Sequence, residues 1–336
     1  MRAVRYHSYG SHEVLVYEEA DRPVAGAGQV IVQVERMAED FSRDPKSIRV
    51  PGIFVDAVVQ ASPENHPQTF AEAFNPDYIR QGDIETIGLE PLEPGVRRVI
   101  ACRSFLEIRD GDVVNLGIGM SEGIARIARE RRRLDRMTLT VEAGPIGGVP
   151  AGGLSFGASL LPQAIIDQPY MFDFYDGGGL DVAFLGMAEC DREGNVNVSR
   201  FSGRVAGIGG FMNITQTARK VVFTGTFTAD GLEVEARAGR LRILAEGKVQ
   251  KFVPAVQQVT FSGPYALRKG QEVLYVTERA VFRLTAEGLE LAETAPGVDV
   301  QRDIRQRMGF APRVSRDLRR MPAESFLQAG EEGATS

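Results

Sequence analysis

Glu142 is the acidic side chain whose sequence neighbours point most directly to chemistry. It follows the apolar segment MTLTV and precedes the run AGPIGGVPAGG, which holds Gly144, Gly147 and Gly148. A carboxylate is a weak nucleophile in water, so it needs a desolvated, preorganised position beside its electrophile. Glycines have no Cβ and let a bulky ligand approach closely. This pattern is compatible with a nucleophilic glutamate and with Gly144, Gly147 and Gly148 in a substrate loop. The alternative is a solvated or N-cap carboxylate, as most acidic residues at strand ends are.

A second glycine cluster comprises Gly207, Gly209 and Gly210, in the segment GIGGFMNIT before an expected short helix. Successive backbone N–H groups in such a turn form a concavity that suits an anion or a developing oxyanion. The alternative is a tight strand-to-helix turn that only requires positive φ angles. The sequence leaves both interpretations open.

The segment Gly117–Gly123 offers a rival interpretation, because glycines between a strand and a helix are typical of dinucleotide turns. Glu142 would then hold a ribose hydroxyl, and the chain would be an NAD(P)-dependent oxidoreductase. The spacing is GxGxxxG, however, where the dinucleotide fingerprint has GxGxxG, and a glycine-rich run follows the acid. The dinucleotide signal is therefore weak.

The elements around Glu142 predict an α/β fold. Helical spacing of apolar residues in 97–108 leads to a turn at 109–112, and DVVNLGIG, EGIARIARERR and MTLTVE then form a strand, a helix and a strand. This order predicts two parallel strands with Glu142 at the carboxyl end of the second, where open sheets bind ligands. Other strands are expected at 3–7, 14–19, 29–35, 52–59, 181–187, 220–227, 233–237, 241–244, 257–261, 273–278, 280–284 and 289–292, the later ones antiparallel, before a helix near 300–308.

The composition fits a globular protein. With 336 residues, 43% of them hydrophobic, the chain can bury the cores of two ordinary domains. The formal net charge of −6 gives no general attraction to nucleic acid or anionic membranes. No stretch resembles a membrane helix or a signal peptide, and two cysteines are too few for a disulfide framework or a structural zinc site. We therefore expect a cytoplasmic protein without a metal, nucleic acid or membrane partner.

Four motifs occur in a characteristic order: VNLGIGMSEGIARIA, LTVEAGPIGGVP, DREGNVNVS and GIGGFMNITQ. Together they resemble the β-type half of family I CoA-transferases, and in particular the single-chain acetate/acetoacetate (short-chain acyl) CoA-transferases, in which an α-type half comes first. The resemblance covers residues 47–310. It implies a CoA-transferase-like α/β fold (the NagB, RpiA and CoA-transferase type), a sheet with flanking helices, here after a short β-rich leader.

The resemblance also implies a mechanism. Glu142 would form an acyl-glutamyl anhydride and then a glutamyl-CoA thioester in a ping-pong cycle, with Gly207, Gly209 and Gly210 in contact with the oxyanion or CoA. Coenzyme A would be substrate and covalent intermediate, and no other cofactor is implied. The substrates would be an acetyl- or acetoacetyl-CoA and a short-chain carboxylate, as in ketone-body and short-chain fatty acid metabolism. We also expect a homo-oligomer.

The beginning of the chain departs from the family pattern. Residues 1–36 resemble the start of zinc-type alcohol dehydrogenases and quinone oxidoreductases and are expected to be an incomplete β-rich leader. Residues 37–95 are expected to be a connector resembling the end of an α-type half, 96–325 the β-type catalytic domain and 326–336 a mobile tail. The main alternative to an active transferase is therefore a non-catalytic remnant, or a subunit that needs an α-type partner.

Overall fold

The computed structural model describes residues 2–6, 15–19, 26–37, 45–201 and 203–327. The chain divides into two compact units, Met1–Asn75 and Pro76–Ser336, with the division inside the expected connector. Most of the expected mobile tail, from residue 328 onward, lies outside the described residues.

The first unit contains a small sheet. Its strands are β1 (Arg2–Tyr6), β2 (Leu15–Glu19), β3 (Ile31–Val34) and β4 (Ala57–Gln60), in the order β2-β1-β4-β3. β1 pairs antiparallel with β2 and β4, whereas β3 and β4 are parallel. The three strands expected in the leader are confirmed.

The second unit is built on a large mixed sheet. Its strands are β5 (Val113–Leu116), β6 (Thr138–Thr140), β7 (Pro145–Ile146), β10 (Ala164–Ile165), β11 (Val182–Gly186), β16 (Lys220–Thr224), β21 (Glu272–Val276), β22 (Ala280–Thr285), β23 (Gly288–Thr294) and β24 (Arg313–Arg320). The smaller pairs are β8 (Val149–Pro150) with β9 (Ser159–Leu160), β12 (Glu189–Cys190) with β13 (Val196–Asn197), β14 (Arg200–Phe201) with β15 (Arg204–Val205), β17 (Thr228–Ala229) with β20 (Val249–Gln250), and β18 (Glu233–Arg237) with β19 (Arg240–Ala245). The helices are α1 (Val96–Phe105), α2 (Gly123–Glu130), α3 (Gln168–Asp176), α4 (Phe211–Thr217) and α5 (Gly263–Lys269).

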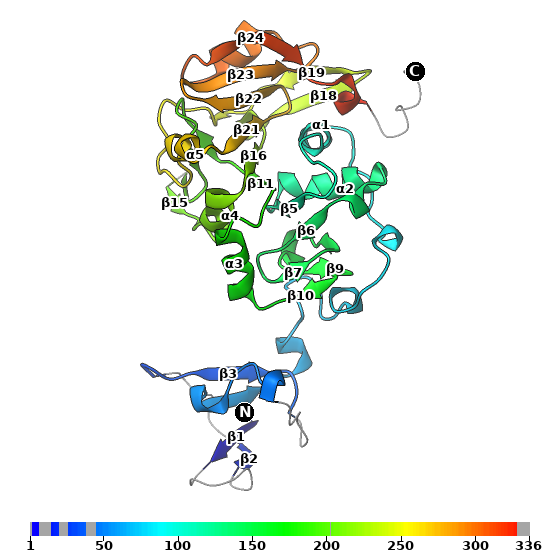
Figure 1. Ribbon diagram of the computed structural model, residues 1–336, viewed down its shortest axis with the longest axis vertical. Helices are drawn as coiled ribbons and strands as arrows, with labels where there is room; N and C mark the ends of the chain where they lie inside the picture. Colours follow the sequence, from blue (N-terminus) through cyan, green and yellow to red (C-terminus); the bar gives the residue numbers. More distant parts are fainter. Residues whose placement is uncertain (1, 7–14, 20–25, 38–44, 202, 328–336) are drawn as a thin grey trace. The chain divides into compact units, whose positions relative to one another are not determined.

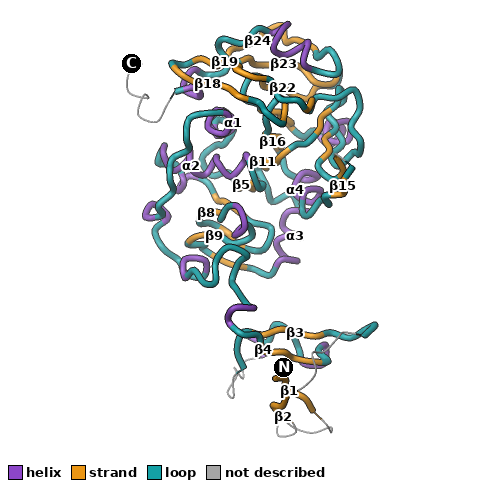
Figure 2. The backbone as a smooth tube through the Cα atoms, turned by 180° about the vertical axis from the view of Figure 1, so that it is seen from behind, coloured by secondary structure: helices purple, strands orange, loops and turns teal. Residues whose placement is uncertain are grey.

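The order in the large sheet is β10-β7-β6-β5-β11-β16-β21-β22-β23-β24. The five strands from β6 to β21 are parallel, so the predicted βαβ unit is confirmed, and β21, β22 and β23 then pair antiparallel as expected. Figures 1 and 2 show α1 and α2 on one side of these strands and α3 and α4 on the other. The carboxyl ends of the parallel strands therefore meet at one edge, between two helical layers.

Burial explains why the central strands sit where they do. In β11 and β16, Val182, Phe184, Val222 and Phe223 are almost completely buried, as expected of parallel strands covered on both faces. Alternation cannot mark such strands, but short runs of branched and aromatic residues do. The α/β fold class predicted from the sequence is confirmed.

Two predicted strands differ from the structure, the one at 52–59 in its first residues and the one at 257–261 over nearly its whole length. Residues Gly52–Phe54 form a 3₁₀ turn with Ile53 exposed, and the strand begins only at Ala57. Residues 257–260 form a loop, in which the backbone and side-chain amides of Gln257 donate hydrogen bonds to Glu189, and Phe261 makes only an isolated antiparallel bridge with Val196.

The edge strand β24 was not predicted. Its sequence RVSRDLRR is mostly exposed and has no apolar alternation, so nothing in it indicates a strand. The helix expected near 300–308 is present as a π-helical turn, Val300–Ile304, followed by a 3₁₀ turn, Arg305–Arg307.

Candidate active site

A cavity of about 440 Å³ opens at the carboxyl edge of the parallel strands. The ends of β5 and β11 form one wall, and the segment before α4 forms another. Its lining residues are Asn115, Gly117, Ile118, Glu142, Phe156, Leu185, Gly186, Met187, Ala188, Val198, Phe201, Gly207, Ile208, Gly209, Gly210, Phe211 and Ile214. The lining is mainly apolar, and Glu142 is the one titratable side chain among these residues.

Glu142 lies two residues beyond β6 and is half-buried in this cavity. Burial raises the pKa of its carboxyl, and a hydrogen bond from the backbone of Gly210 offsets part of that shift. No Lys or Arg forms an ion pair with Glu142 among the residues that the structure describes. The carboxylate is therefore partly desolvated and has no counter-ion in the described part of the chain.

Gly210 lies so close to Glu142 that a Cβ at this position would collide with Oε2 of the carboxylate. Its φ of −79° is ordinary for any residue, so close approach rather than backbone conformation requires glycine here. Gly207 and Gly209 have φ of +82° and +50° and open space around them. The structure thus brings the carboxylate and the second glycine cluster into one cavity.

A buried hydrogen-bond network fixes the end of β6, just before the carboxylate. The side-chain amide of Asn115 donates to the carbonyl of Thr140 at 3.2 Å and to the hydroxyl of Tyr175 at 3.3 Å. The Tyr175 hydroxyl donates to Oγ1 of Thr140 at 3.0 Å. Burial raises the pKa of Tyr175, and the negative charge of Glu142 adds to the shift. These residues were missed by sequence reasoning; an asparagine inside the apolar strand VVNL was the available signal.

The first glycine run is placed differently. Gly144, Gly147 and Gly148 lie outside the cavity lining. A Cβ on Gly144 would collide with the carbonyl of Ile166, one on Gly148 with the carbonyl of Leu160, and one on Gly147 would approach Gln163. Contacts within the chain therefore account for these glycines, and their place in a substrate loop stays a prediction.

The dinucleotide interpretation finds little support at the start of α2. Oε1 of Glu122 accepts a hydrogen bond from the backbone N–H of Gly119 at 2.9 Å, and Oε2 contacts Arg97 at 3.2 Å. A carboxylate of the chain itself thus lies where the fingerprint would place a pyrophosphate. The carboxylate of Glu122 therefore occupies this turn, and its negative charge disfavours an anionic ligand there.

Within the described ranges, no three His, Cys, Asp or Glu side chains converge on a possible metal position. No helix of the described part combines the length and the apolar character needed for a bilayer span.

The chain is similar to several known proteins. No protein-family model matches the chain. The chain is 43% identical over 304 residues to the acetate CoA-transferase YdiF of Escherichia coli K12, covering 90% of this chain and 57% of YdiF. It is 32% identical to the acetate CoA-transferase subunit beta of Escherichia coli K12, covering 60% of this chain and 86% of that subunit. A crystal structure of the Escherichia coli O157:H7 acyl-CoA transferase YdiF, a thioester complex with CoA, matches with a TM-score of 0.79 at 42% identity, over 89% of this chain and 56% of that one.

The fold defines an α/β protein of the CoA-transferase type, and its candidate site is a carboxylate-bearing cavity at the sheet edge. The chain belongs to the family I CoA-transferases. It spans 57% of the length of the full-length relative YdiF.

Proposed function

We propose that this chain supplies the catalytic half of a CoA-transferase, which moves CoA between a short-chain acyl-CoA and a carboxylate. The single observation that carries the proposal is Glu142, a half-buried carboxylate that touches the backbone of Gly210 in an apolar cavity and that no described cation pairs with. The family of the chain supports the reaction class. The thioester complex of the related YdiF supports a covalent intermediate.

The environment of Glu142 favours nucleophilic attack for a physical reason. Desolvation weakens the solvent shell that makes a carboxylate a poor nucleophile, and the network below β6 restricts its position. Because no Lys or Arg of the described chain neutralises it, its charge remains available to the electrophile. The Gly207–Gly210 segment lines the same cavity as Glu142, which supports an oxyanion site there.

The proposed steps balance without water. A carboxylate oxygen of Glu142 attacks the thioester carbon, the C–S bond breaks, and CoA thiolate leaves an acyl-glutamyl anhydride. The thiolate then attacks the glutamyl carbonyl carbon and releases the first acid as a carboxylate. A second carboxylate reverses both steps and leaves with CoA. In this scheme the thioester free energy is kept, and CoA is substrate and covalent intermediate without a further cofactor.

The first experiment tests the nucleophile. The purified chain is incubated with acetoacetyl-CoA, and intact mass spectrometry follows a CoA adduct that hydroxylamine removes. We expect Glu142→Gln to slow adduct formation by about 1,000-fold or more, because an amide cannot replace the attacking carboxylate. Glu233→Gln, at an exposed position of β18, is the matched control and should label like the unaltered chain. An adduct that persists in Glu142→Gln would contradict the proposal.

A second candidate function is a subunit that needs an α-type partner, or a non-catalytic remnant, and the likeness to the acetate CoA-transferase subunit beta favours a subunit. An α-type half of an acetate CoA-transferase, expressed separately, is added to the chain, and transfer between acetoacetyl-CoA and acetate is measured. Restored transfer would show that the chain acts with an α-type partner. Absence of both transfer and adduct would favour the non-catalytic role.

The compartment and assembly belong to the same proposal. Cys102 and Cys190 are buried cysteines, and so few cysteines suit a reducing cytoplasm. We propose a homo-oligomer there, to be measured by light scattering during size-exclusion chromatography.

A further inference from the structure

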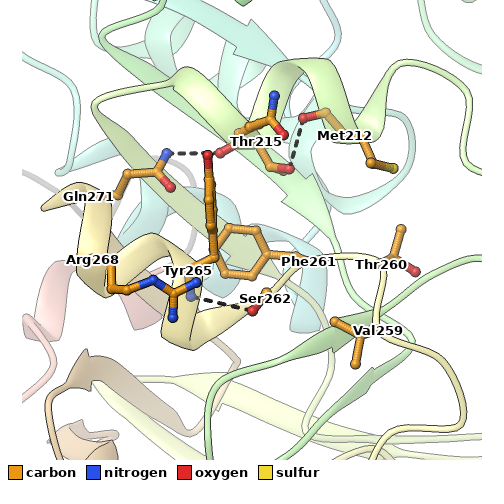
Figure 3. Close-up of a pocket in the computed structure, with 10 residues that line it drawn as sticks. Met212, Thr215, Val259, Thr260, Phe261, Ser262, Tyr265, Arg268 and Gln271 are labelled. Atoms are coloured by element: carbon orange, nitrogen blue, oxygen red, sulfur yellow. Dashed lines mark hydrogen bonds between the residues drawn. The ribbon is translucent and has the colours of Figure 1, made fainter.

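Lys251 is a buried cation to which the proposed chemistry gives no role. It follows β20, and only 8% of its surface is exposed. Among the described residues, its ammonium makes no ion pair and donates no hydrogen bond. Arg268 provides a contrast, because it is exposed at the open groove between α4 and α5 shown in Figure 3, where water can solvate its charge. Lys251 has neither solvent nor a partner, and a buried cation of this kind disfavours folding.

The ammonium of Lys251 lies at the carboxyl edge of the parallel strands, behind one wall of the Glu142 cavity. A Cβ on Gly225, the residue after β16, would lie 2.7 Å from Nζ of Lys251. The same position is 3.5 Å from both Cγ and the carbonyl oxygen of Met187, which follows β11 and lines the cavity. Lys251 and Met187 therefore approach each other where Gly225 has no side chain to separate them.

The charged and titratable neighbours of Lys251 are Glu278 and Cys190. Glu278 lies in the turn between β21 and β22, but its Oε1 also accepts a hydrogen bond from Nε of Arg279 at 2.6 Å, and its Oε2 accepts one from the backbone N–H of Phe227 at 2.9 Å. Burial lowers the pKa of Lys251 to about 8, and the attraction of Glu278 and Cys190 opposes only part of that shift. The charge of Lys251 is therefore unfavourable in the folded protein.

Stability does not explain why a lysine occupies this position. An apolar side chain of similar length would fill the same space without a desolvated charge. Residues that weaken a fold are frequently kept for activity, and Lys251 lies directly behind residues that line the candidate active site. Its position next to the Met187 carbonyl indicates how it acts on that site. A carbonyl oxygen is the negative end of a dipole, and an ammonium attracts it more strongly in a dry environment than in water.

We infer that Lys251 is a positioning residue for the transferase reaction, which holds the Met187–Ala188 wall of the cavity in place through its positive charge. The inference rests on the proposed function, because it takes Glu142 as the nucleophile in this cavity. Ala188 also lines the cavity, and its backbone N–H donates to the carbonyl of Asn197 at 3.0 Å. The wall is thus held by a hydrogen bond on one side and by a buried charge on the other.

The first test separates a positioning role from a structural one. Because the folded-state pKa of Lys251 lies below the ordinary value of 10.5, its charged form disfavours folding at pH 7, and this effect fades as the pH rises toward 10.5. We expect Lys251→Met to raise the melting temperature by about 2–4 °C at pH 7, with a smaller gain at higher pH. The same variant should form the acetoacetyl-CoA adduct about 10- to 100-fold more slowly. A variant that is both less stable and slower would indicate a structural residue and overturn the inference.

The second test is the pH profile of adduct formation. In the unaltered chain the rate should fall about tenfold as the pH rises through about 8, because Lys251 loses its charge there. Lys251→Met should be slow without this fall, whereas Lys251→Arg keeps a charge and should recover part of the rate. Lys248→Met is the matched control, since Lys248 is exposed, and it should match the unaltered chain. The same fall in Lys251→Met as in the unaltered chain would contradict the inference.

The third measurement needs no chemistry. The chain is labelled with ¹³C at the methionine methyl carbons, and Met187→Leu identifies the signal of Met187. We expect this signal to shift with a midpoint near pH 8 in the unaltered chain and not in Lys251→Met. An adduct together with a Met187 signal that does not respond to pH overturns the inference alone. No adduct together with a responding signal overturns the proposed function, while the contact of Lys251 with the wall stands.

Discussion

The second unit contains buried carboxylates that are paired with cations and a half-buried carboxylate, Glu142, that has no cation beside it among the described residues. Glu107 and Glu293 surround Arg103 of α1: Nε and Nη2 of Arg103 contact Glu293 at 2.7 and 3.0 Å, and Nη1 contacts Glu107 at 2.7 Å. Lys220 of β16 reaches Glu107 at 2.9 Å. Glu142, at the sheet edge, has no cation beside it among the described residues.

The pKa values follow this difference. Burial raises the pKa of Glu107, but Arg103 and Lys220 outweigh it, so the pKa of Glu107 lies below its ordinary value. Burial also raises the pKa of Glu142, and only one backbone hydrogen bond opposes it. Burial alone therefore does not mark a reactive carboxylate. The informative feature is desolvation without an opposing cation.

Removing Arg103, the cation between Glu107 and Glu293, should have the largest effect on this comparison. Arg103→Met leaves Glu293 and Glu107 buried with less compensation, and we expect unfolding to require about 3–5 kcal/mol less free energy. Urea unfolding followed by circular dichroism measures this change. The double variant Arg103→Met/Glu293→Gln should recover part of the loss, because it removes the uncompensated charge as well.

Arg242→Met is a control for arginine loss, since its pair with Glu235 is exposed. It should cost less than about 1 kcal/mol. If Arg103→Met were equally mild, the cluster would contribute little, and the contrast with Glu142 would not hold.

The catalytic side can be sharpened at Gly210. Gly210→Ala places a methyl group against Oε2 of Glu142 without straining the backbone. We expect the rate of adduct formation with acetoacetyl-CoA to fall about 10- to 100-fold, because small displacements of a reacting group are costly. Gly88→Ala, where a Cβ meets no atom within 4 Å, should react normally. An unchanged rate in Gly210→Ala would mean that the carboxylate position is not critical.

The smallest effect concerns stability and pH. Because the folded-state pKa of Glu142 lies above the ordinary value of 4.5, ionisation of this group disfavours folding at neutral pH. Glu142→Gln should therefore be more stable at pH 7, by less than about 1 kcal/mol because solvent screens a half-buried charge. The gain should disappear as the pH falls below 4.5, where the carboxyl is protonated in both states. Thermal unfolding across pH measures it, and a gain independent of pH would contradict the assignment.

Much of the fold could be predicted from the sequence because its central strands are short apolar runs between turn residues. The apolar residues of β11 and β16 are most stable in the interior, so their sequences predict buried strands. The segment 257–261 was mistaken for a strand because its apolar residues resemble one, while hydrogen bonds from Gln257 to Glu189 depend on the tertiary fold. The exposed strand β24 carried no pattern at all.

The site was predictable only in part. Glu142 follows a parallel strand, and its position at the sheet edge could be expected from that alone. The roles proposed for Gly207, Gly209 and Gly210 remain predictions, although the structure places these residues in the same cavity. The contacts among Asn115, Thr140 and Tyr175 could not be inferred, because they join segments far apart in the sequence.

The isolated position of Glu142 also bears on the lifetime of the proposed intermediate. Converting this anion to a thioester would make it neutral, which an apolar cavity accommodates more readily than a charge. The loaded protein would then be the more relaxed form, and it could wait while one acid diffuses out and the next arrives. A half-buried charge in the resting protein would thus favour a long-lived thioester intermediate.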